Sequence, residues 1–422
     1  MHSVTNAIPT GTIASIPAKA HAHRALICAA LANSPSTILL SRTSKDIDAT
    51  MDSLRGLGTH VVYENKVVTV TPGPVPAKGN VVPHESGTTL RLLLPVAASI
   101  CNDVDVDAKG RLPDRPLEPM LSEMKAHGVT FSQDKPSFTI TGRLQGGNFS
   151  MVGDVSSQFF SGLLLAAPQI GLSTITATTP LQSSDYVTLT TETMRDFGVE
   201  VEHTLPDTNI NEAFTVPFGA SFIGRDNYQI EGDWSNAAIW MVAAGMTGKP
   251  ITITGMNKNS VQADRRIMQV MIDAGCDVVW DGMNVTVTGR AFKPIHADLE
   301  QMPDMLPVMA ALACSISGES SFIKGARLRL KESDRLITVA NLVRDLGGTV
   351  REEGDDLYII GSGILKGGHG DCVNDHRLVM AGTLMALISE NPVTLKDSEA
   401  ITKSYPDFFE DWNLLGGDAH GI

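Results

Sequence analysis

The sequence predicts an α/β protein of two similar lobes and six internal repeats, and three observations lead to this prediction. First, a chain of 422 residues is too long for one ordinary core, so two large lobes or about three domains are expected. Second, one helical pattern rich in Ala, Leu and Met recurs along nearly the whole chain. Third, a second helical pattern, which ends at glycine and passes into alternating β-branched residues, occurs between copies of the first.

The first pattern consists of polar or glycine residues, an apolar helical run, and a turn that leads into a strand-like segment. Its six copies begin at equivalent positions, which are Lys19, Gly87, Ser157, Ser235, Asp304 and His376. The intervals between these positions are 68, 70, 78, 69 and 72 residues. Because apolar helices are usually core elements, we expect the interiors of these helices to be buried. The period is longer than that of a solenoid repeat, and three units per lobe is the natural grouping.

The second pattern is an amphipathic helix with apolar residues three and four apart, a glycine stop and then strands. It occurs in the segments 49–70, 119–142, 265–289 and 334–361. In the last segment, Gly354, Asp355 and Asp356 predict a hairpin turn. Each repeat is therefore predicted to run strand–helix–strand–helix–strand–strand.

Composition excludes several classes of protein. The net charge of −14 and the lack of a long basic stripe argue against a nucleic-acid partner. The cysteines lie far apart, which favours inert thiols in a reducing compartment over a disulfide framework or a zinc site. These cysteines are Cys28, Cys101, Cys276, Cys314 and Cys372. No apolar run reaches the roughly 18 residues that span a bilayer, so we expect a cytoplasmic protein with no membrane partner.

The beginnings of the repeated helices carry polar pairs where a helix has free N–H groups and a partial positive charge. These pairs are Ser156–Ser157, Ser235–Asn236, Pro303–Asp304 and Asp375–His376. A single start of this kind is simply a cap. Several starts that converge would form an anion-binding surface.

Basic residues recur close to these helix starts, and two acids stand among them. The basic residues are Lys19, Arg24, Arg91, Arg115, Lys331, Arg335, Arg377 and Lys403, and the acids are Asp304 and Glu332. Arginine suits bidentate recognition of carboxylate and phosphate, whereas lysine is a mobile point charge that can carry a proton. Each charge taken alone is explained by a solvated surface or a structural ion pair. Their joint recurrence predicts a site for a small, multiply charged anion.

Simpler motifs are absent. The chain has no GxxxxGK[ST] loop and no GxGxxG that opens a helix, so neither a P-loop nor a dinucleotide site is predicted. His21 and His23 are two residues apart and point to different sides of a helix, so we do not expect them to bind a metal.

Five segments resemble the 5-enolpyruvylshikimate-3-phosphate synthase family, a branch of the enolpyruvyl transferases. They are 109–116 (KGRLPDRP), 153–168 (GDVSSQFFSGLLLAAP), 183–190 (SSDYVTLT), 329–336 (RLKESDRL) and 401–412 (ITKSYPDFFEDW). The match extends over about residues 16–412 in the order and spacing of the family. The resemblance implies an inside-out α/β barrel fold of two lobes, each of three βαβαββ units. One lobe would comprise residues 17–228 and the other residues 1–16 and 229–422, with the active site in the cleft between them.

The resemblance also implies the reaction, which is transfer of the enolpyruvyl group of phosphoenolpyruvate to the 5-hydroxyl of shikimate 3-phosphate. This step of the shikimate pathway releases phosphate and leads to chorismate and the aromatic amino acids. The family implies no metal and no organic cofactor, and we expect a monomer whose partners are these two small molecules. The reaction needs acid and base groups and must neutralise two phosphates and two carboxylates, which the charged residues could supply.

The family's functional residues map onto this chain one by one. The catalytic residues would be Asp304, Glu332, Lys19 and Lys403. The residues that would bind shikimate 3-phosphate are Lys19, Arg24, Ser156, Ser157, Gln158, Ser183, Tyr186, Asp304 and Lys331. The residues that would bind phosphoenolpyruvate are Lys19, Gly87, Arg91, Arg115, Gln158, Arg335, Arg377 and Lys403.

Two residues depart from the family pattern. Ala20 replaces a serine that would offer a hydroxyl to shikimate 3-phosphate, and Glu85 adds negative charge where the family usually has asparagine. These departures keep open a paralogue that uses another acceptor, such as UDP-N-acetylglucosamine. The segment 111–116 lacks the catalytic-loop cysteine usual in that related family. A non-catalytic anion-binding protein is disfavoured because Asp304, Glu332 and Lys403 are all present.

Overall fold

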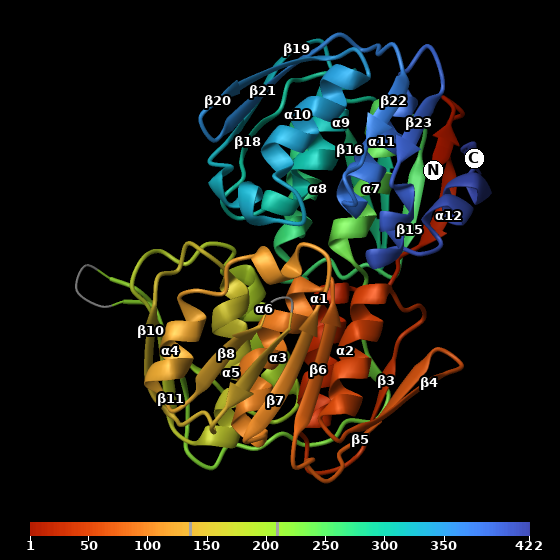
Figure 1. Cartoon of the computed structure of the whole chain (residues 1–422). Helices are drawn as coiled ribbons and strands as arrows, with labels where there is room; N and C mark the ends of the chain where they lie inside the picture. Colours follow the sequence, from red (N-terminus) through yellow and green to blue (C-terminus); the bar gives the residue numbers. More distant parts are fainter. Residues whose placement is uncertain (135–136, 208–210) are drawn as a thin grey trace. The chain divides into compact units, whose positions relative to one another are not determined.

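The computed structural model describes residues 1–134, 137–207 and 211–422. The chain divides into two compact units: unit 1 contains residues 1–16 and 231–422, and unit 2 contains residues 17–230. The chain therefore begins in unit 1, builds unit 2 and returns. Both termini belong to unit 1, where the N-terminal strand β1 (His2–Val4) pairs antiparallel with the C-terminal strand β24 (Ala419–Gly421) (Figure 1).

The described residues of unit 2 form three four-stranded sheets. They are β14 (Tyr228–Gln229)–β3 (Ser36–Leu39)–β5 (Val67–Thr71)–β4 (His60–Glu64), β6 (Gly79–His84)–β7 (Asp103–Ala108)–β9 (Ser137–Thr141)–β8 (Thr130–Asp134), and β10 (Gly147–Met151)–β11 (Ser173–Ala177)–β13 (Ala213–Val216)–β12 (Glu202–Thr204). Its helices are α1 (Lys19–Ala30), α2 (Lys45–Gly56), α3 (Gly87–Ile100), η1 (Leu112–Asp114), α4 (Met120–Ala126), α5 (Ser157–Ile170) and α6 (Asp185–Asp196).

Unit 1 also contains three four-stranded sheets. They are β16 (Asp277–Asp281)–β17 (Asn284–Thr288)–β15 (Ile251–Thr254)–β2 (Gly11–Ala14), β18 (His296–Asp298)–β19 (Gly318–Ile323)–β21 (Asp356–Gly361)–β20 (Thr349–Glu353), and β22 (Gly368–Asp371)–β23 (Val393–Lys396)–β1–β24. Its helices are α7 (Trp234–Thr247), η2 (Ala263–Arg266), α8 (Ile267–Asp273), η3 (Pro303–Met305), α9 (Leu306–Ser315), η4 (Ala326–Leu330), α10 (Arg335–Asp345), α11 (His376–Ala386), η5 (Ser398–Lys403) and α12 (Phe408–Leu414).

The predicted α/β class and the six repeats are confirmed. Every sheet joins one parallel strand pair to two antiparallel pairs. The order β6–α3–β7–α4–β8–β9 is the predicted strand–helix–strand–helix–strand–strand unit. Strands from distant parts of the chain complete three of the sheets, namely β14, β2 and β1. Two residues of the predicted segment 119–142, at 135 and 136, lie outside the described residues.

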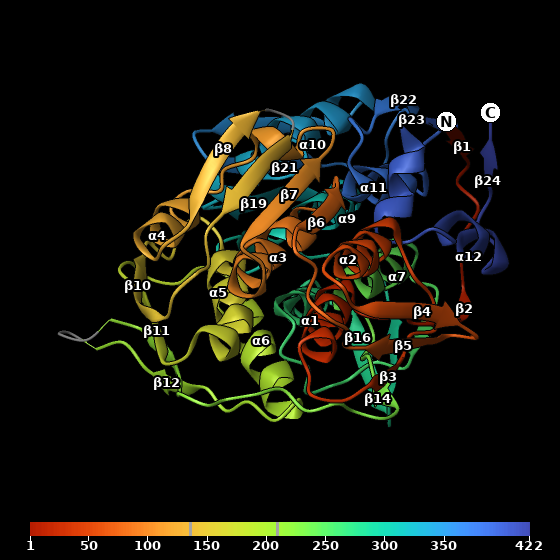
Figure 2. The same cartoon turned by 60° about the horizontal axis from the view of Figure 1, so that its bottom comes forward.

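The apolar helices form the cores, as predicted. Every residue of α9 and α11 is buried, as are most residues of α3, α5 and α7, so these helices are largely enclosed by protein. In unit 2, α3 lies along the sheet that contains β6 and β7 (Figure 2). Helices α3 and α5 approach closely because Gly162 has no side chain, since a Cβ atom there would lie 2.5 Å from the Arg91 carbonyl oxygen.

Two local predictions, the hairpin turn at Gly354 and the free cysteines, are also confirmed. The turn at Gly354 joins β20 to β21 with a φ of 60°, as the hairpin prediction requires. All five cysteines are free and buried, and burial raises the pKa of Cys276 to about 11 and that of Cys314 to about 12. Within the three described ranges, no helix has the length and apolar character needed to cross a membrane.

Candidate active site

Four of the six repeated helices are capped by the side chain of the residue before the helix, whereas Pro303 and Asp304 lie in η3, which has no side-chain cap. Ser86, Ser156, Asp233 and Asp375 each accept a hydrogen bond from a backbone N–H in the first turn of α3, α5, α7 and α11. A capped start has one fewer N–H group to offer an anion. In contrast, α1 begins at Lys19 with no side-chain cap.

The charged cluster of unit 1 is built around the Arg335 guanidinium, which is 1% exposed. Its Nε donates to Asp375 Oδ2 at 2.8 Å, and one terminal nitrogen donates to Asp304 Oδ1 at 2.6 Å. The other terminal nitrogen donates to Glu332 Oε2 at 2.7 Å and to Asp375 Oδ1 at 3.1 Å. One arginine therefore holds both predicted acid–base residues in place. Burial lowers the pKa of Arg335, but the three carboxylates outweigh this effect and raise the pKa above its usual value.

Two further predicted cations surround Asp304. Lys331 Nζ lies 3.0 Å from Asp304 Oδ1, and a terminal nitrogen of Arg377 lies 4.0 Å from Asp304 Oδ2. Burial alone would raise the pKa of Asp304, but Lys331, Arg377 and Arg335 together hold it well below its usual range. Burial lowers the pKa of Lys331, against the opposing effect of Asp304. Asp304 is therefore an ionised carboxylate, which can accept hydrogen bonds.

Lys403 lies at the end of η5 and contacts the segment that precedes α11. Its Nζ donates to the Asn374 carbonyl oxygen at 2.8 Å. Asn374 has a φ of 53°, a left-handed conformation that asparagine tolerates better than most residues. Lys403 is thus placed beside the helix start that carries Asp375 and Arg377.

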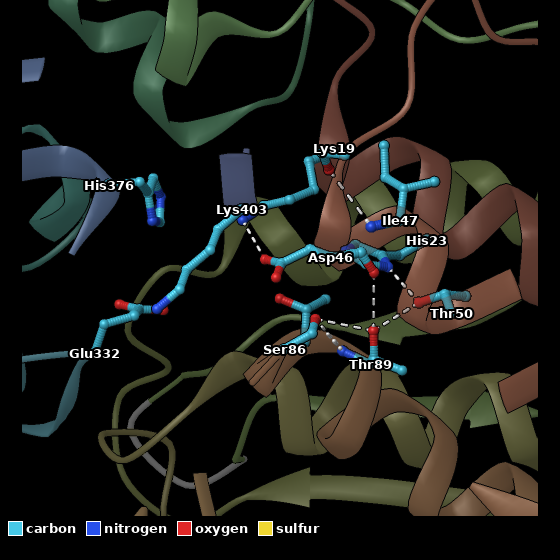
Figure 3. A network of polar contacts seen from close by, with 12 residues as sticks. Lys19, His23, Asp46, Ile47, Thr50, Ser86, Thr89, Glu332, His376 and Lys403 are labelled. Carbon is cyan, nitrogen blue, oxygen red and sulfur yellow. Dashed lines mark hydrogen bonds and ion pairs between the residues drawn. The ribbon is translucent and has the colours of Figure 1, made fainter. Parts of the chain in front are cut away.

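In unit 2, Lys19 is oriented by a carboxylate and by a hydroxyl network behind it. Lys19 Nζ pairs with Asp46 Oδ2 at 2.7 Å (Figure 3). The backbone of Asp46 contacts the network, because its carbonyl oxygen lies 3.3 Å from Thr89 Oγ1. Thr89 Oγ1 also lies 2.7 Å from Thr50 Oγ1, which lies 2.6 Å from His23 Nδ1. Burial, followed by the nearby Lys19 charge, holds the pKa of His23 well below its usual value, so this network is uncharged.

A second group in unit 2 gathers around Gly87, the first residue of α3. A Cβ atom on Gly87 would lie 2.6 Å from a terminal nitrogen of Arg115 and 3.2 Å from one of Arg91. Arg91 donates to Gln158 Oε1 at 3.2 Å, and Gln158 donates to Thr88 Oγ1 at 2.9 Å. The structure therefore brings together Gly87, Arg91, Arg115 and Gln158, all predicted to bind phosphoenolpyruvate.

Arg24 is a predicted site residue whose side chain lies deep inside unit 2, with 1% of its surface exposed. Its guanidinium donates to the Thr190 and Ser161 hydroxyls and to the carbonyl oxygens of Ala20 and Tyr186. Burial lowers the pKa of Arg24 to about 10, so it remains a cation at neutral pH. Its substrate contact stays a prediction.

The remaining predicted residues occupy two loops and helix starts of unit 2. Ser156 caps α5, Ser157 is its first residue, and both are largely buried. Ser183, with a φ of 53°, precedes α6 by two residues, and Tyr186 is the second residue of that helix.

The two departures from the family pattern have visible surroundings. The Ala20 carbonyl oxygen accepts from Arg24, so the backbone at this position helps to hold the guanidinium. The Glu85 side chain lies against Gly110, where a Cβ atom would be 2.9 Å from Glu85 Cδ. Gly110 therefore leaves the space that this glutamate occupies.

Three carboxylates of these clusters were not among the predicted site residues. They are Asp46, which pairs with Lys19, Asp264, which lies near Arg377, and Asp375, which holds Arg335. Asp375 was recognised only as part of a helix start. Within the described ranges, no group of three or more His, Cys, Asp or Glu side chains could hold a metal ion.

Comparisons with known proteins show the family of this chain. The family model described as EPSP synthase (3-phosphoshikimate 1-carboxyvinyltransferase) matches residues 7–412. A 3-phosphoshikimate 1-carboxyvinyltransferase of Clostridium kluyveri is 36% identical, over 97% of this chain and 95% of that protein. One of Methanocorpusculum labreanum is 35% identical, over 97% of each chain. The solved EPSP synthase of Acinetobacter baumannii, 23% identical, shares the fold with a TM-score of 0.80 over 100% of this chain and 99% of its own. The chain therefore belongs to the EPSP synthase (3-phosphoshikimate 1-carboxyvinyltransferase) family.

Proposed function

We propose that this chain transfers the enolpyruvyl group of phosphoenolpyruvate to the 5-hydroxyl of shikimate 3-phosphate and releases phosphate. The observation that carries the proposal is the Arg335 cluster, in which one buried guanidinium holds Asp304 and Glu332 at 2.6 and 2.7 Å. Family membership over residues 7–412 gives the reaction its substrates. The chain acts as a transferase in the shikimate pathway.

The reaction has three proton and bond events, and each needs a suitable group. The methylene carbon of phosphoenolpyruvate gains a proton while the 5-hydroxyl oxygen attacks the neighbouring carbon and loses its proton. The tetrahedral intermediate then loses phosphate, and the methyl group returns a proton to restore the double bond. We assign these proton transfers to Asp304, Glu332, Lys19 and Lys403. The ionised Asp304 suits the hydroxyl side of the reaction, where it can accept a hydrogen bond from the 5-hydroxyl group and orient it.

The binding roles are those that the resemblance to the family implies. The residues assigned to phosphoenolpyruvate are Lys19, Gly87, Arg91, Arg115, Gln158, Arg335, Arg377 and Lys403. The residues assigned to shikimate 3-phosphate are Lys19, Arg24, Ser156, Ser157, Gln158, Ser183, Tyr186, Asp304 and Lys331. The contacts of Arg24 support its assignment to shikimate 3-phosphate. Its guanidinium donates to neutral oxygens, so its positive charge can attract an anion.

We further propose a monomer that acts in the cytoplasm. The second candidate function is enolpyruvyl transfer to a different acceptor, and one observation favours it. Ala20 lacks the hydroxyl usual in the family, at the uncapped start of α1.

The test is phosphate release from phosphoenolpyruvate, with shikimate 3-phosphate and UDP-N-acetylglucosamine as parallel acceptors and product identification by mass. We expect release with shikimate 3-phosphate alone. Release with UDP-N-acetylglucosamine alone would replace the proposal by the second candidate. Folded protein that releases no phosphate with either acceptor would refute both.

A further inference from the structure

Asp264 is a buried carboxylate that has no role in the proposed function. It lies on η2 and is 1% exposed. The Ser235 hydroxyl, in the first turn of α7, donates to Asp264 Oδ2. Among the described residues, Asp264 Oδ1 has no hydrogen-bond partner. A buried carboxylate oxygen without a donor is costly, so its retention calls for an explanation.

A cation at ion-pair distance from this carboxylate, Arg377, is a predicted ligand of phosphoenolpyruvate. The same terminal nitrogen of Arg377 lies 4.0 Å from Asp264 Oδ2 and 4.0 Å from Asp304 Oδ2. Arg377 is thus placed evenly between two carboxylates, at ion-pair distance from each and beyond hydrogen-bond distance from both. Asp304 is already paired with Lys331 and Arg335.

The charged groups that act on Asp264 come from three neighbouring elements. Asp233 at the start of α7 and Asp304 on η3 disfavour its ionisation, while Arg377 on α11 and the Ser235 hydroxyl favour it. Burial is the largest effect, and the pKa of Asp264 is raised to about 6. The folded protein therefore binds the Asp264 proton more tightly than the unfolded chain does. Stability is lost as pH rises from the ordinary pKa of 3.8 through about 6, so the ionised form destabilises the fold at neutral pH.

We propose that Asp264 is a positioning residue, whose carboxylate holds the Arg377 guanidinium away from direct pairing with Asp304 and so keeps it available to phosphoenolpyruvate. This inference rests on the proposed function of Arg377. Without the Asp264 charge, Asp304 would be the remaining carboxylate of the pair and would attract Arg377 onto itself. Phosphoenolpyruvate would lose a ligand, and Asp304 would become a weaker base.

The experiment compares Asp264→Asn with wild type. Asparagine keeps the shape and can still accept from Ser235, but it removes the charge. With shikimate 3-phosphate saturating and phosphoenolpyruvate varied, we expect kcat/KM to fall about tenfold, mainly through KM, as one oriented charge contact is lost. At pH 7.5 the Tm of the variant should equal or exceed that of wild type, and at pH 5 this advantage should shrink.

Two further variants keep the result interpretable. Ser235→Ala removes the hydroxyl donor to Asp264 and should raise KM for phosphoenolpyruvate by a smaller factor. Asp411→Asn is the matched control, because Asp411 is also buried in unit 1 and accepts from a hydroxyl, that of Tyr405 at 2.7 Å. Its kinetics should match those of wild type.

Failure of this inference is distinguishable from failure of the proposed function. A variant Asp264→Asn with wild-type kinetics, or with a lower Tm at pH 7.5, would show a merely structural carboxylate and overturn the inference. If wild type itself releases no phosphate, the proposed reaction fails, and direct binding of phosphoenolpyruvate measured by calorimetry decides the inference. Equal affinities of wild type and variant, or no binding by wild type, would then overturn it, whereas weaker binding by the variant would support it.

Discussion

Two buried arginines, one in each unit, are held by different chemistry. Arg335 in unit 1 and Arg24 in unit 2 are each 1% exposed. The guanidinium of Arg335 donates to three carboxylates, those of Asp304, Glu332 and Asp375. Among the described residues, the guanidinium of Arg24 donates only to neutral oxygens, which are two hydroxyls and two backbone carbonyls.

The difference shows in the pKa values and suggests different tasks. Carboxylates raise the pKa of Arg335 in spite of burial, while burial lowers that of Arg24 to about 10. A cation with neutral partners keeps its full charge for an incoming anion, whereas a cation among acids keeps those acids ionised and oriented. We therefore infer that the Arg24 region of unit 2 serves mainly substrate binding, and the Arg335 cluster of unit 1 serves proton transfer.

The largest expected effect comes from removing each arginine in turn. Arg335→Met leaves three acids without their shared counterion and should lower the free energy of unfolding by about 3–5 kcal/mol, as for a broken buried ion pair. Arg24→Met leaves only neutral acceptors without a donor, so its loss should be about 1–3 kcal/mol. Urea denaturation of both variants measures the difference.

The control for this comparison is an exposed arginine. Arg351 forms ion pairs with Glu319 and Glu353, but its side chain is 43% exposed. Arg351→Met should change the free energy of unfolding by less than about 1 kcal/mol. Equal losses for Arg335→Met and Arg24→Met would contradict the distinction between the two units.

The second prediction tests the acid–base role assigned to unit 1. Glu332→Gln keeps an oxygen that can accept from Arg335 but removes the carboxyl proton chemistry, so kcat should fall by at least about 100-fold. KM for both substrates should change by only a few-fold, because the cluster keeps its shape. Steady-state kinetics measure both quantities, with Glu352→Gln as the control, since Glu352 forms a surface ion pair with Arg344. A kcat close to that of wild type would remove Glu332 from proton transfer.

The fold of both units could be predicted from the sequence more completely than the contacts within their candidate sites. The six repeats are readable because helix periodicity, glycine stops and strand alternation are local features, and local features predicted β6–α3–β7–α4–β8–β9 in the right order. The strands β1, β2 and β14 complete sheets whose other strands are distant in sequence, and no local pattern indicates such pairing.

The contacts between site residues depend on the packing of whole helices. Arg335 and Asp375 are 40 residues apart in the sequence, so no local pattern indicates that they pair. Asp46 lies in the first turn of α2, where an acidic residue is commonly found because it interacts favourably with the helix dipole. Charge type is visible in the sequence, but partners are not. For this reason the recurrent cations were predicted, whereas Asp46, Asp264 and Asp375 were not predicted as partners of Lys19, Arg377 and Arg335.

The smallest expected effect concerns the uncharged network behind Lys19. Thr50→Val keeps the shape of the side chain but removes the hydroxyl between His23 Nδ1 and Thr89 Oγ1, which are 2.6 and 2.7 Å from it. Both partners lose a hydrogen bond within the protein interior, so the free energy of unfolding should fall by about 1–2 kcal/mol. The network contacts the Asp46 backbone, so we expect a rise of a few-fold in KM for phosphoenolpyruvate.

The matched control for this variant is Thr193→Val. Thr193 is equally buried, but its hydroxyl donates to the Leu189 carbonyl oxygen of its own helix at 2.7 Å. That carbonyl already belongs to the helix, so the substitution should cost less than about 1 kcal/mol and leave KM unchanged. If Thr50→Val destabilised the protein as much as Arg335→Met does, the neutral network would contribute as much to the free energy of unfolding as the Arg335 cluster. The contrast between the two units would then be one of function alone, and no longer one of stability.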